Sequence, residues 1–233
     1  MNNKRCRKSF YTSLNIIMSQ IISIEGNIGS GKSTLLHHLK DYFKDNTNII
    51  FLQEPVDEWN KIKDINGKTI LEKFYENQQK YSFAFQMMAY ISRLSMLKKC
   101  IEENPNSIII TERCLNTDKY VFAKMLYDDN KIEDVEYQIY LNWFDNFSYL
   151  EHSQKVVYLK TDSNICAQRI NKRNRLGENN IRFDYLENCE KYHENMLNEI
   201  NNEKLIIDTN IDTEINKDII IKWCNMIKNF IFT

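Results

Sequence analysis

The segment from Gly26 to Thr34, GNIGSGKST, limits the fold of this chain more than any other part, because it matches the phosphate-loop pattern G-x-x-x-x-G-K-[ST]. An apolar run at 21–24 precedes it and leucines at helical spacing follow it, which predicts a strand, a turn and a helix. Backbone N–H groups of such a turn, together with the helix N-terminus, attract phosphate oxygens. The residues expected to bind a nucleotide are Gly26, Asn27, Ile28, Gly29, Ser30, Gly31, Lys32, Ser33 and Thr34.

Further apolar runs at 49–52, 108–110, 156–159 and 205–207 are separated by long segments with helical periodicity. Strands that alternate with helices indicate a parallel sheet covered on both faces. We therefore expect an α/β fold of the P-loop kinase type, with a five-stranded parallel sheet flanked by helices. Ligands of such sheets bind beyond the carboxyl ends of the strands. The segment 68–103 is expected to be mainly helix.

The length and composition fit one domain. With 233 residues, 42% of them hydrophobic, and only two prolines and five glycines, the chain leaves little room for a linker. We expect a single domain over 20–233, preceded by a basic and flexible leader at 1–19. The leader also resembles a weak transit peptide, so a cytoplasmic location is expected, or a mitochondrial one if the leader is a targeting signal.

The charge pattern excludes several classes of partner. A formal net charge of −1 supplies no general attraction for nucleic acid or an anionic membrane. No apolar run approaches the roughly 18 to 20 residues of a membrane span. The six scattered cysteines contain no C-x-x-C pair, which favours reduced thiols in an intracellular protein. We therefore expect a small-molecule partner.

Polar residues follow the predicted strands. Glu54 comes after the second strand, where a carboxylate could take a proton from an attacking hydroxyl; a solvated loop glutamate is the alternative. Glu112 and Arg113 end the third strand, where phosphate-loop enzymes place a carboxylate for Mg²⁺, and a structural ion pair is the alternative. Lys32 is expected to reach the outer phosphates, and the Ser33 hydroxyl to bind Mg²⁺.

Three arginines, Arg169, Arg173 and Arg175, form a basic segment at i, i+4, i+6 spacing. Guanidinium groups this close repel one another unless anions lie between them, and phosphoryl transfer needs positive charge. The segment predicts an arginine-rich lid, and a solvated basic face is the alternative. A group of aromatic residues with one amide could form a flat slot for a base, although most such aromatics belong to a core. Its members are Trp59, Tyr75, Tyr81, Phe83, Phe85, Gln86 and Phe122.

Together these residues make the chain resemble the deoxynucleoside kinase family, which includes deoxycytidine, deoxyguanosine and mitochondrial thymidine kinases. The resemblance extends from about Ile21 to Asp212, with the motifs in the family's order. These motifs are Ile24 to Thr34, Glu54-Pro55-Val56-x-x-Trp59, Tyr81 to Gln86, Thr111-Glu112-Arg113, Asp118 to Ala123 and Arg169-Ile170-x-x-Arg173-x-Arg175.

The resemblance implies an ATP-dependent and Mg²⁺-dependent kinase that phosphorylates the 5′-hydroxyl of a deoxyribonucleoside in nucleotide salvage, acting as a homodimer. It implies Glu54 as general base, Arg113 as its partner, and Ser33 and Glu112 at the metal. The migrating phosphoryl group would be stabilised by Lys32, Arg169, Arg173 and Arg175. The nucleoside would be bound by Trp59, Tyr75, Phe85, Gln86, Phe122 and Glu178, and the donor adenine by the loop with Asp208, Asn210 and Asp212.

Base choice in this family depends on the positions of Ala89, Arg93 and Asp118. An Arg93–Asp118 pair would crowd a thymine methyl group and offer an acceptor to an exocyclic amine. We therefore expect deoxycytidine or purine deoxynucleosides to be preferred over thymidine. A purely structural ion pair is the alternative at this position.

Two other functions remain open at this stage. A nucleoside monophosphate kinase similar to thymidylate kinase would share the fold and the lid, but it needs an extra basic group for the acceptor phosphate and no carboxylate base. A switch protein that binds ATP without catalysis would not need Glu54, Glu112 and three lid arginines together. Turnover of nucleosides or of monophosphates would distinguish these functions.

Overall fold

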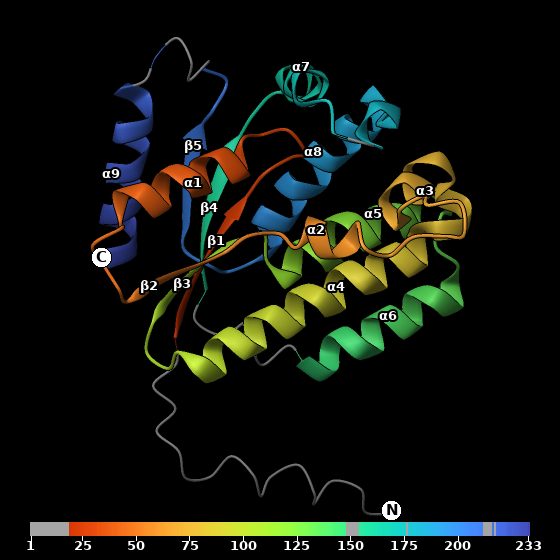
Figure 1. The fold of residues 1–233 in the computed structure, drawn as a ribbon, viewed down its shortest axis with the longest axis horizontal. Helices are drawn as coiled ribbons and strands as arrows, with labels where there is room; N and C mark the ends of the chain where they lie inside the picture. Colours follow the sequence, from red (N-terminus) through yellow and green to blue (C-terminus); the bar gives the residue numbers. More distant parts are fainter. Residues whose placement is uncertain (1–18, 148–153, 176, 212–215, 217) are drawn as a thin grey trace, which may run out of the picture.

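The computed structural model describes residues 19–147, 154–175, 177–211, 216 and 218–233. Within them, five strands form one parallel sheet in the order β2-β3-β1-β4-β5 (Figure 1). This arrangement confirms the predicted α/β class and the five-stranded parallel sheet. The strands are β1 (Gln20–Glu25), β2 (Ile49–Leu52), β3 (Ile108–Glu112), β4 (Gln154–Lys160) and β5 (Lys204–Asp208).

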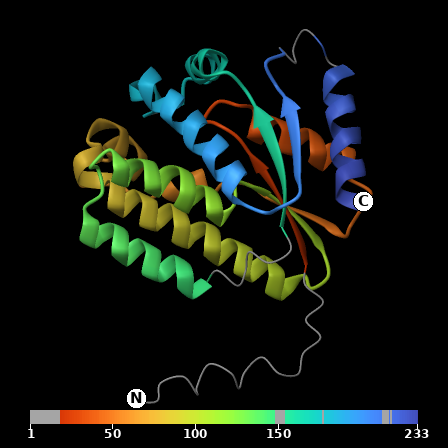
Figure 2. The ribbon, with the colours of Figure 1, turned by 180° about the vertical axis from the view of Figure 1, so that it is seen from behind.

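Both faces of the sheet are covered by helices. On one face α1 (Lys32–Tyr42) and α9 (Asp218–Phe232) pack against apolar residues of β1, β3, β4 and β5. On the other face lie α4 (Gln78–Glu103), the turn η1 (Thr117–Ala123) and α8 (Phe183–Glu199). Outside α4, α6 (Asp134–Phe147) adds a further layer, as Figures 1 and 2 show.

The segment predicted as mainly helical is helical with one break. It consists of α3 (Ile70–Glu76) and α4, separated at Asn77. Asn77 has φ −146° and its side chain accepts a hydrogen bond from Lys80 N, which begins a new helix instead of continuing the old one. Thr69 and Glu72 form a capping box at the start of α3. The break turns α3 toward the cavity described below.

Shorter elements complete the fold. They are α2 (Val56–Trp59), α5 (Lys124–Asp128), α7 (Ser163–Arg173) and the 3₁₀ turn η3 (Glu178–Asn180). The turn η1 is π-helical, which means that its backbone hydrogen bonds join residues five positions apart instead of four. Ser19, at the predicted end of the leader, is buried and its hydroxyl donates to Asn104 O. No helix in the described parts of the chain combines the length and apolarity needed to cross a bilayer.

Candidate active site

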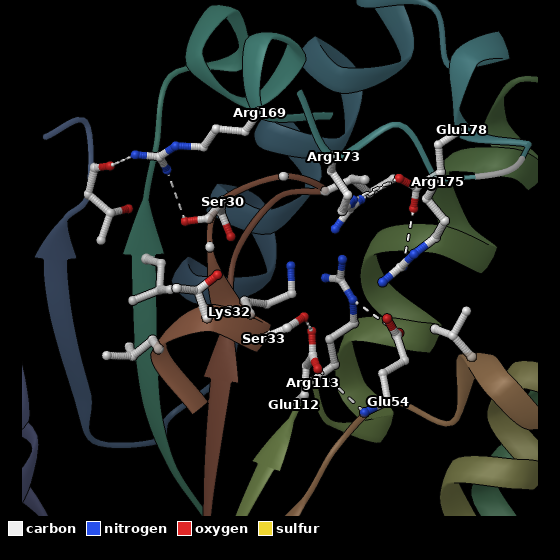
Figure 3. Close-up of a pocket in the computed structure, with 18 of the residues that line it drawn as sticks. Ser30, Lys32, Ser33, Glu54, Glu112, Arg113, Arg169, Arg173, Arg175 and Glu178 are labelled. Atoms are coloured by element: carbon white, nitrogen blue, oxygen red, sulfur yellow. Dashed lines mark hydrogen bonds and ion pairs between the residues drawn. The ribbon is translucent and has the colours of Figure 1, made fainter. Parts of the chain in front are cut away.

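A cavity of about 950 Å³ opens at the carboxyl ends of the strands, where the parallel sheet predicts a ligand site. Figure 3 shows side chains from several separate elements converging on it. Its size matches that of typical ligand pockets. The cavity is lined by Ile28 to Thr34 of the phosphate loop and, from the predicted set, by Glu54, Trp59, Tyr75, Phe85, Gln86, Arg93, Glu112, Arg113, Asp118, Phe122, Arg169, Arg173, Arg175, Glu178 and Asn210.

The phosphate loop has the backbone that its glycines allow. Gly29 and Gly31 adopt φ values of +81° and +97°, in the region that favours glycine. A Cβ atom at Gly29 would lie 2.5 Å from Cys166 O, so the loop also packs too closely for a side chain there. Gly26 and Asn27, at the start of the loop, do not line the cavity, and the Asn27 amide donates to Leu186 O at 2.9 Å, which ties the loop to α8.

Lys32 is buried and turned back onto the loop. Its Nζ donates to Asn27 O at 2.7 Å and to Gly26 O at 3.1 Å. Burial, and the nearby positive charge of Arg113, lower the pKa of Lys32 to about 7. A phosphate group entering the loop would favour the charged form and restore its full positive charge.

Ser33 and Glu112 meet at the mouth of the loop. The Ser33 hydroxyl donates to Glu112 Oε1 at 2.7 Å. Glu112 is the last residue of β3, directly beside Ile24 of β1, and the adjacency of the two strands brings the carboxylate to the start of α1. Hydroxyl and carboxylate oxygens are the ligands that Mg²⁺ prefers, so this donor set fits the ion.

Glu54 lies between two buried guanidinium groups. Arg93 Nη2 donates to Glu54 Oε1 at 2.9 Å, and Arg113 Nε lies 3.4 Å from the same oxygen. Burial alone would raise the pKa of Glu54, but Arg113, Arg93 and Lys32 lower it to about 2. Glu54 is therefore ionised at neutral pH and points into the cavity (Figure 3).

Arg113 is held in a conformation that few non-glycine residues adopt. Its φ is +66°, a strain of about 1–3 kcal/mol that the surrounding contacts must offset. Its backbone N–H donates to Ile24 O, Nη1 donates to Gly26 O at 2.9 Å, and the guanidinium lies 4.9 Å from the centre of the Phe122 ring. Among the described residues none accepts a hydrogen bond from Nη2, which leaves that group available to a ligand.

Arg93 has a role that the sequence did not reveal. It pairs with Asp118, as predicted, through Nε at 2.9 Å and Nη2 at 3.4 Å. The same guanidinium also donates to Glu54 and to Glu112 O. Burial opposes the charge of Arg93, but Asp118 and Glu54 outweigh it and raise the pKa above its ordinary value. Nothing in the spacing of Glu54, Arg93 and Asp118 along the chain indicates that one guanidinium contacts both carboxylates.

The lid arginines separate into two groups. Arg173 donates to Glu178 Oε2 through Nε at 3.0 Å, and Arg175 Nη1 lies 3.3 Å from Glu178 Oε1. Arg169 instead donates to Ser30 O and Thr209 O, and Figure 3 shows it directed toward the loop after β5, away from Arg173 and Arg175. Helix α7 ends at Arg173, so Arg175 lies beyond the helix.

The aromatic residues form one wall of the cavity. Phe85 stacks on Phe74 with ring centres 4.6 Å apart and meets Trp59 edge to face at 5.6 Å. Gln86 is buried and also lines the cavity, and no described residue hydrogen-bonds its amide. Burial, and then Glu178, raise the pKa of Tyr75, so its hydroxyl remains a donor. Tyr81 and Phe83 do not line the cavity.

The predicted loop for the donor base is only partly brought to the cavity. Asn210 lines it, and Asn210 Oδ1 accepts from Asp162 N at 2.9 Å. Asp208 is exposed and does not line the cavity, because its carboxylate caps the Asn210 N–H instead. Asp212 lies outside the described residues. The sequence missed His38, Ile220, Ile221 and Trp223, which line this side, because helical periodicity does not separate core from cavity.

Comparisons with known proteins agree with this site. The family model "Deoxynucleoside kinase" matches residues 22–231. A Fowlpox virus protein named "Probable deoxycytidine kinase" is 36% identical over 185 residues, covering 78% of this chain and 73% of the relative. The deoxycytidine kinase of Homo sapiens is 31% identical over 214 residues, covering 83% of this chain and 81% of the relative. With this match, which includes the phosphate loop, Glu54 and the arginine lid, the chain belongs to the deoxynucleoside kinase family.

Proposed function

We propose that this enzyme transfers the γ-phosphate of ATP to the 5′-hydroxyl of deoxycytidine or a purine deoxynucleoside, in preference to thymidine. The observation that carries the proposal is the position of Glu54. It lies in the same cavity as the phosphate loop and the aromatic wall. A nucleoside bound on that wall would therefore present its sugar toward Glu54 and toward the phosphate loop. A relative from Homo sapiens with the name deoxycytidine kinase supports the same substrate class.

In the proposed reaction, the 5′-oxygen forms a bond to the γ-phosphorus while the bond from that phosphorus to the β,γ-bridging oxygen breaks, and ADP leaves. The hydroxyl proton passes to Glu54. A carboxylate with a pKa of about 2 is a weak base, so the proton moves only once bonding to phosphorus has made the hydroxyl acidic. We assign Arg113 Nη2 to hold the attacking oxygen beside Glu54, because Nε of the same guanidinium lies 3.4 Å from Glu54 Oε1.

Positive charge for the transferring group comes from the phosphate loop and from the lid. Lys32 lies in the loop, and Arg173 and Arg175 face the same space from the lid (Figure 3). We assign Ser33 and Glu112 to Mg²⁺, which neutralises phosphate charge when it is bound. Among the described residues no three His, Cys, Asp or Glu side chains cluster as a cation cage, so the phosphates would complete the coordination. Arg169 donates a hydrogen bond to Thr209 O, and we assign it to the donor nucleotide rather than to the acceptor.

The proposed preference for bases rests on the buried Arg93–Asp118 pair. Asp118 Oδ1 receives only the long 3.4 Å contact from Arg93, so it keeps capacity to accept from an exocyclic amine. Gln86 lines the same cavity, and its amide has no hydrogen-bond partner among the residues that the structure describes. The base would lie between Phe122 and the wall of Trp59 and Phe85, and the sugar 3′-hydroxyl would bind Tyr75 and Glu178.

The test is the initial rate of phosphorylation with ATP and Mg²⁺ for the four deoxynucleosides, with dCMP and dTMP as further acceptors. Activity on deoxycytidine or purine deoxynucleosides with little on thymidine would support the proposal. Strong thymidine activity would make the Arg93–Asp118 pair purely structural. Phosphorylation of the monophosphates alone would contradict the proposed acceptor and favour a monophosphate kinase.

We also propose a homodimer formed through α4 and α6. Val135, Ile139 and Trp143 are exposed at four-residue spacing along one side of α6, and Ile91 is exposed on α4. The two helices lie side by side in both views (Figures 1 and 2). Light scattering after size exclusion tests this: the wild type should have twice the chain mass, and Ile139→Glu with Trp143→Glu should give monomers. A monomeric wild type would contradict the proposal.

A further inference from the structure

His193 of α8 is a buried ring that the proposed reaction does not use. Its side chain is fully buried beside the rings of Tyr158 and Phe122, and the Phe122 ring is perpendicular to the imidazole. Its Nδ1 lies 2.6 Å from Cys189 O, and its Nε2 lies 3.4 Å from Arg113 Nη1. A buried imidazole with both nitrogens engaged has a fixed orientation.

The two partners determine the protonation of the ring. A backbone carbonyl only accepts, so Nδ1 must carry the proton toward Cys189 O. A guanidinium only donates, so Nε2 must present a lone pair to Arg113 Nη1. Burial and the charge of Arg113 both lower the pKa of His193 far below its ordinary value, which agrees with a neutral ring.

Arg113 depends on such contacts. Its backbone is in the left-handed region, a conformation that persists in a non-glycine residue only where the surrounding structure holds it. One Nη1 hydrogen is taken by Gly26 O, and His193 Nε2 faces the other. With Nη1 held between the loop and α8, Nε is directed at Glu54, and Nη2 has no acceptor in the described part of the chain.

We propose that His193 is a positioning residue that acts through Arg113: the neutral ring, anchored on Cys189 O, holds the guanidinium so that Nε faces Glu54 and Nη2 faces the attacking oxygen. The inference rests on the role proposed for Arg113. His193 touches neither substrate, so its loss should lower kcat and leave the KM for the nucleoside nearly unchanged.

Two substitutions separate this role from a structural one. His193→Asn keeps a donor for Cys189 O but removes the acceptor for Arg113, whereas His193→Gln keeps an acceptor near the Nε2 position and loses the donor. We expect His193→Asn to lower kcat by about tenfold or more, with the nucleoside KM within about threefold, and His193→Gln to stay within about threefold of the wild-type kcat. Wild-type kcat in His193→Asn, or equal losses in both variants, would overturn the proposal.

A double-mutant cycle with Arg113→Lys completes the test. If His193 acts through Arg113, His193→Asn should cost little further activity in the Arg113→Lys background. Independent, multiplying losses would contradict it. If Arg113→Lys alone leaves kcat unchanged, the proposed role of Arg113 is wrong. If Arg113→Lys is impaired but His193→Asn is fully active, the role of Arg113 stands and the role proposed for His193 is wrong. If His193→Asn does not fold, His193→Gln decides alone: a tenfold loss of kcat overturns the proposal.

Discussion

Arg93 Nη2 lies 2.9 Å from Glu54 Oε1 while the same guanidinium pairs with Asp118. One buried arginine therefore connects the carboxylate proposed for proton transfer with the carboxylate proposed for base recognition. A change at the base-recognition end alters the charge balance at Glu54, because both carboxylates share one positive group. Substrate preference and turnover are therefore expected to change together in variants of this pair.

Replacing Asp118 with Asn tests how much the buried pair contributes to stability. Asp118→Asn leaves Arg93 buried with a single carboxylate partner, and removing one member of a buried pair costs about 3 kcal/mol or more. Urea unfolding should show a lower free energy of unfolding of this order. The exposed pair of Lys61 and Glu58 is the control, and Glu58→Gln should change stability by less than about 1 kcal/mol. Equal losses of unfolding free energy in Asp118→Asn and Glu58→Gln would show that the buried Arg93–Asp118 pair does not stabilise the fold.

Glu54→Gln should separate binding from turnover. The amide fits the same space but cannot accept the proton, so kcat should fall by about a hundredfold or more while nucleoside affinity by calorimetry changes little. Asp57→Asn, on the exposed side of α2, is the control and should keep wild-type kcat. Near-normal turnover in Glu54→Gln would exclude Glu54 as the base.

The stability that Glu54 contributes should depend on pH in one direction. Its pKa is about 2 in the folded protein and 4.5 in its ordinary state, so the ionised form stabilises the fold above pH 4.5 and this contribution is lost as the pH falls toward 2. The difference in unfolding free energy between wild type and Glu54→Gln should therefore shrink from pH 6 to pH 3. If this difference in unfolding free energy does not change with pH, the arginines do not stabilise the ionised form of Glu54.

Lys32 should take up a proton when ATP binds. With a pKa of about 7 in the free enzyme, Lys32 is mostly neutral at pH 8, and phosphate contact restores its charge. Calorimetry of MgATP binding in buffers of different ionisation enthalpy should show an uptake of about 0.9 proton at pH 8 and about 0.1 at pH 6. Lys32→Arg, which stays charged throughout, should lack this uptake. The same uptake in both proteins would assign the proton to another group.

Ser33 can be tested by its response to Mg²⁺. Ser33→Ala removes the hydroxyl that contacts Glu112 and should raise the Mg²⁺ concentration for half-maximal activity by about tenfold. Ser33→Thr keeps the hydroxyl and serves as the matched control, with a Mg²⁺ requirement close to that of the wild type. An unchanged Mg²⁺ response in Ser33→Ala would remove this residue from the metal site.

Two glycines with nearly the same φ allow the cost of backbone strain to be measured apart from the cost of a steric clash. Gly29 and Gly67 have φ values of +81° and +82°, but a Cβ atom would meet Cys166 O at 2.5 Å in the first and nothing within 4 Å in the second. Gly67→Ala should cost about 1–2 kcal/mol of strain alone. Gly29→Ala should cost clearly more and weaken ATP binding, measured by unfolding and calorimetry. Equal costs would show that the loop can shift away from Cys166.

The sequence predicts this fold well because its strongest patterns are local. Apolar runs predict the strands, and their alternation with helices predicts a parallel sheet whose carboxyl edge collects Glu54, Glu112 and Arg113. The break at Asn77 was not predicted, because a continuous helical pattern spans it and only the cap geometry of Asn77 begins the second helix.

The contacts within the site depend on the three-dimensional structure. Arg93 reaches Glu54 from α4, and Arg169 reaches Thr209 across the loop after β5, so no spacing along the chain reveals either contact. Asp208 illustrates the opposite error. It follows a predicted strand, as Glu54 does, but its carboxylate caps a neighbouring backbone N–H and stays exposed. Position after a strand therefore identifies candidates without giving the direction of their side chains.

The spacing of residues along η1 brings two of its side chains to the cavity. Asp118 and Phe122 both line it, the first beside Arg93 and the second under Arg113. Asp118 and Phe122 are four positions apart, close to one helical turn, so both side chains leave the same side of η1. This spacing gives one short segment both a polar and an aromatic boundary of the cavity, so the length of η1 and its two side chains together limit which ligands the cavity can hold.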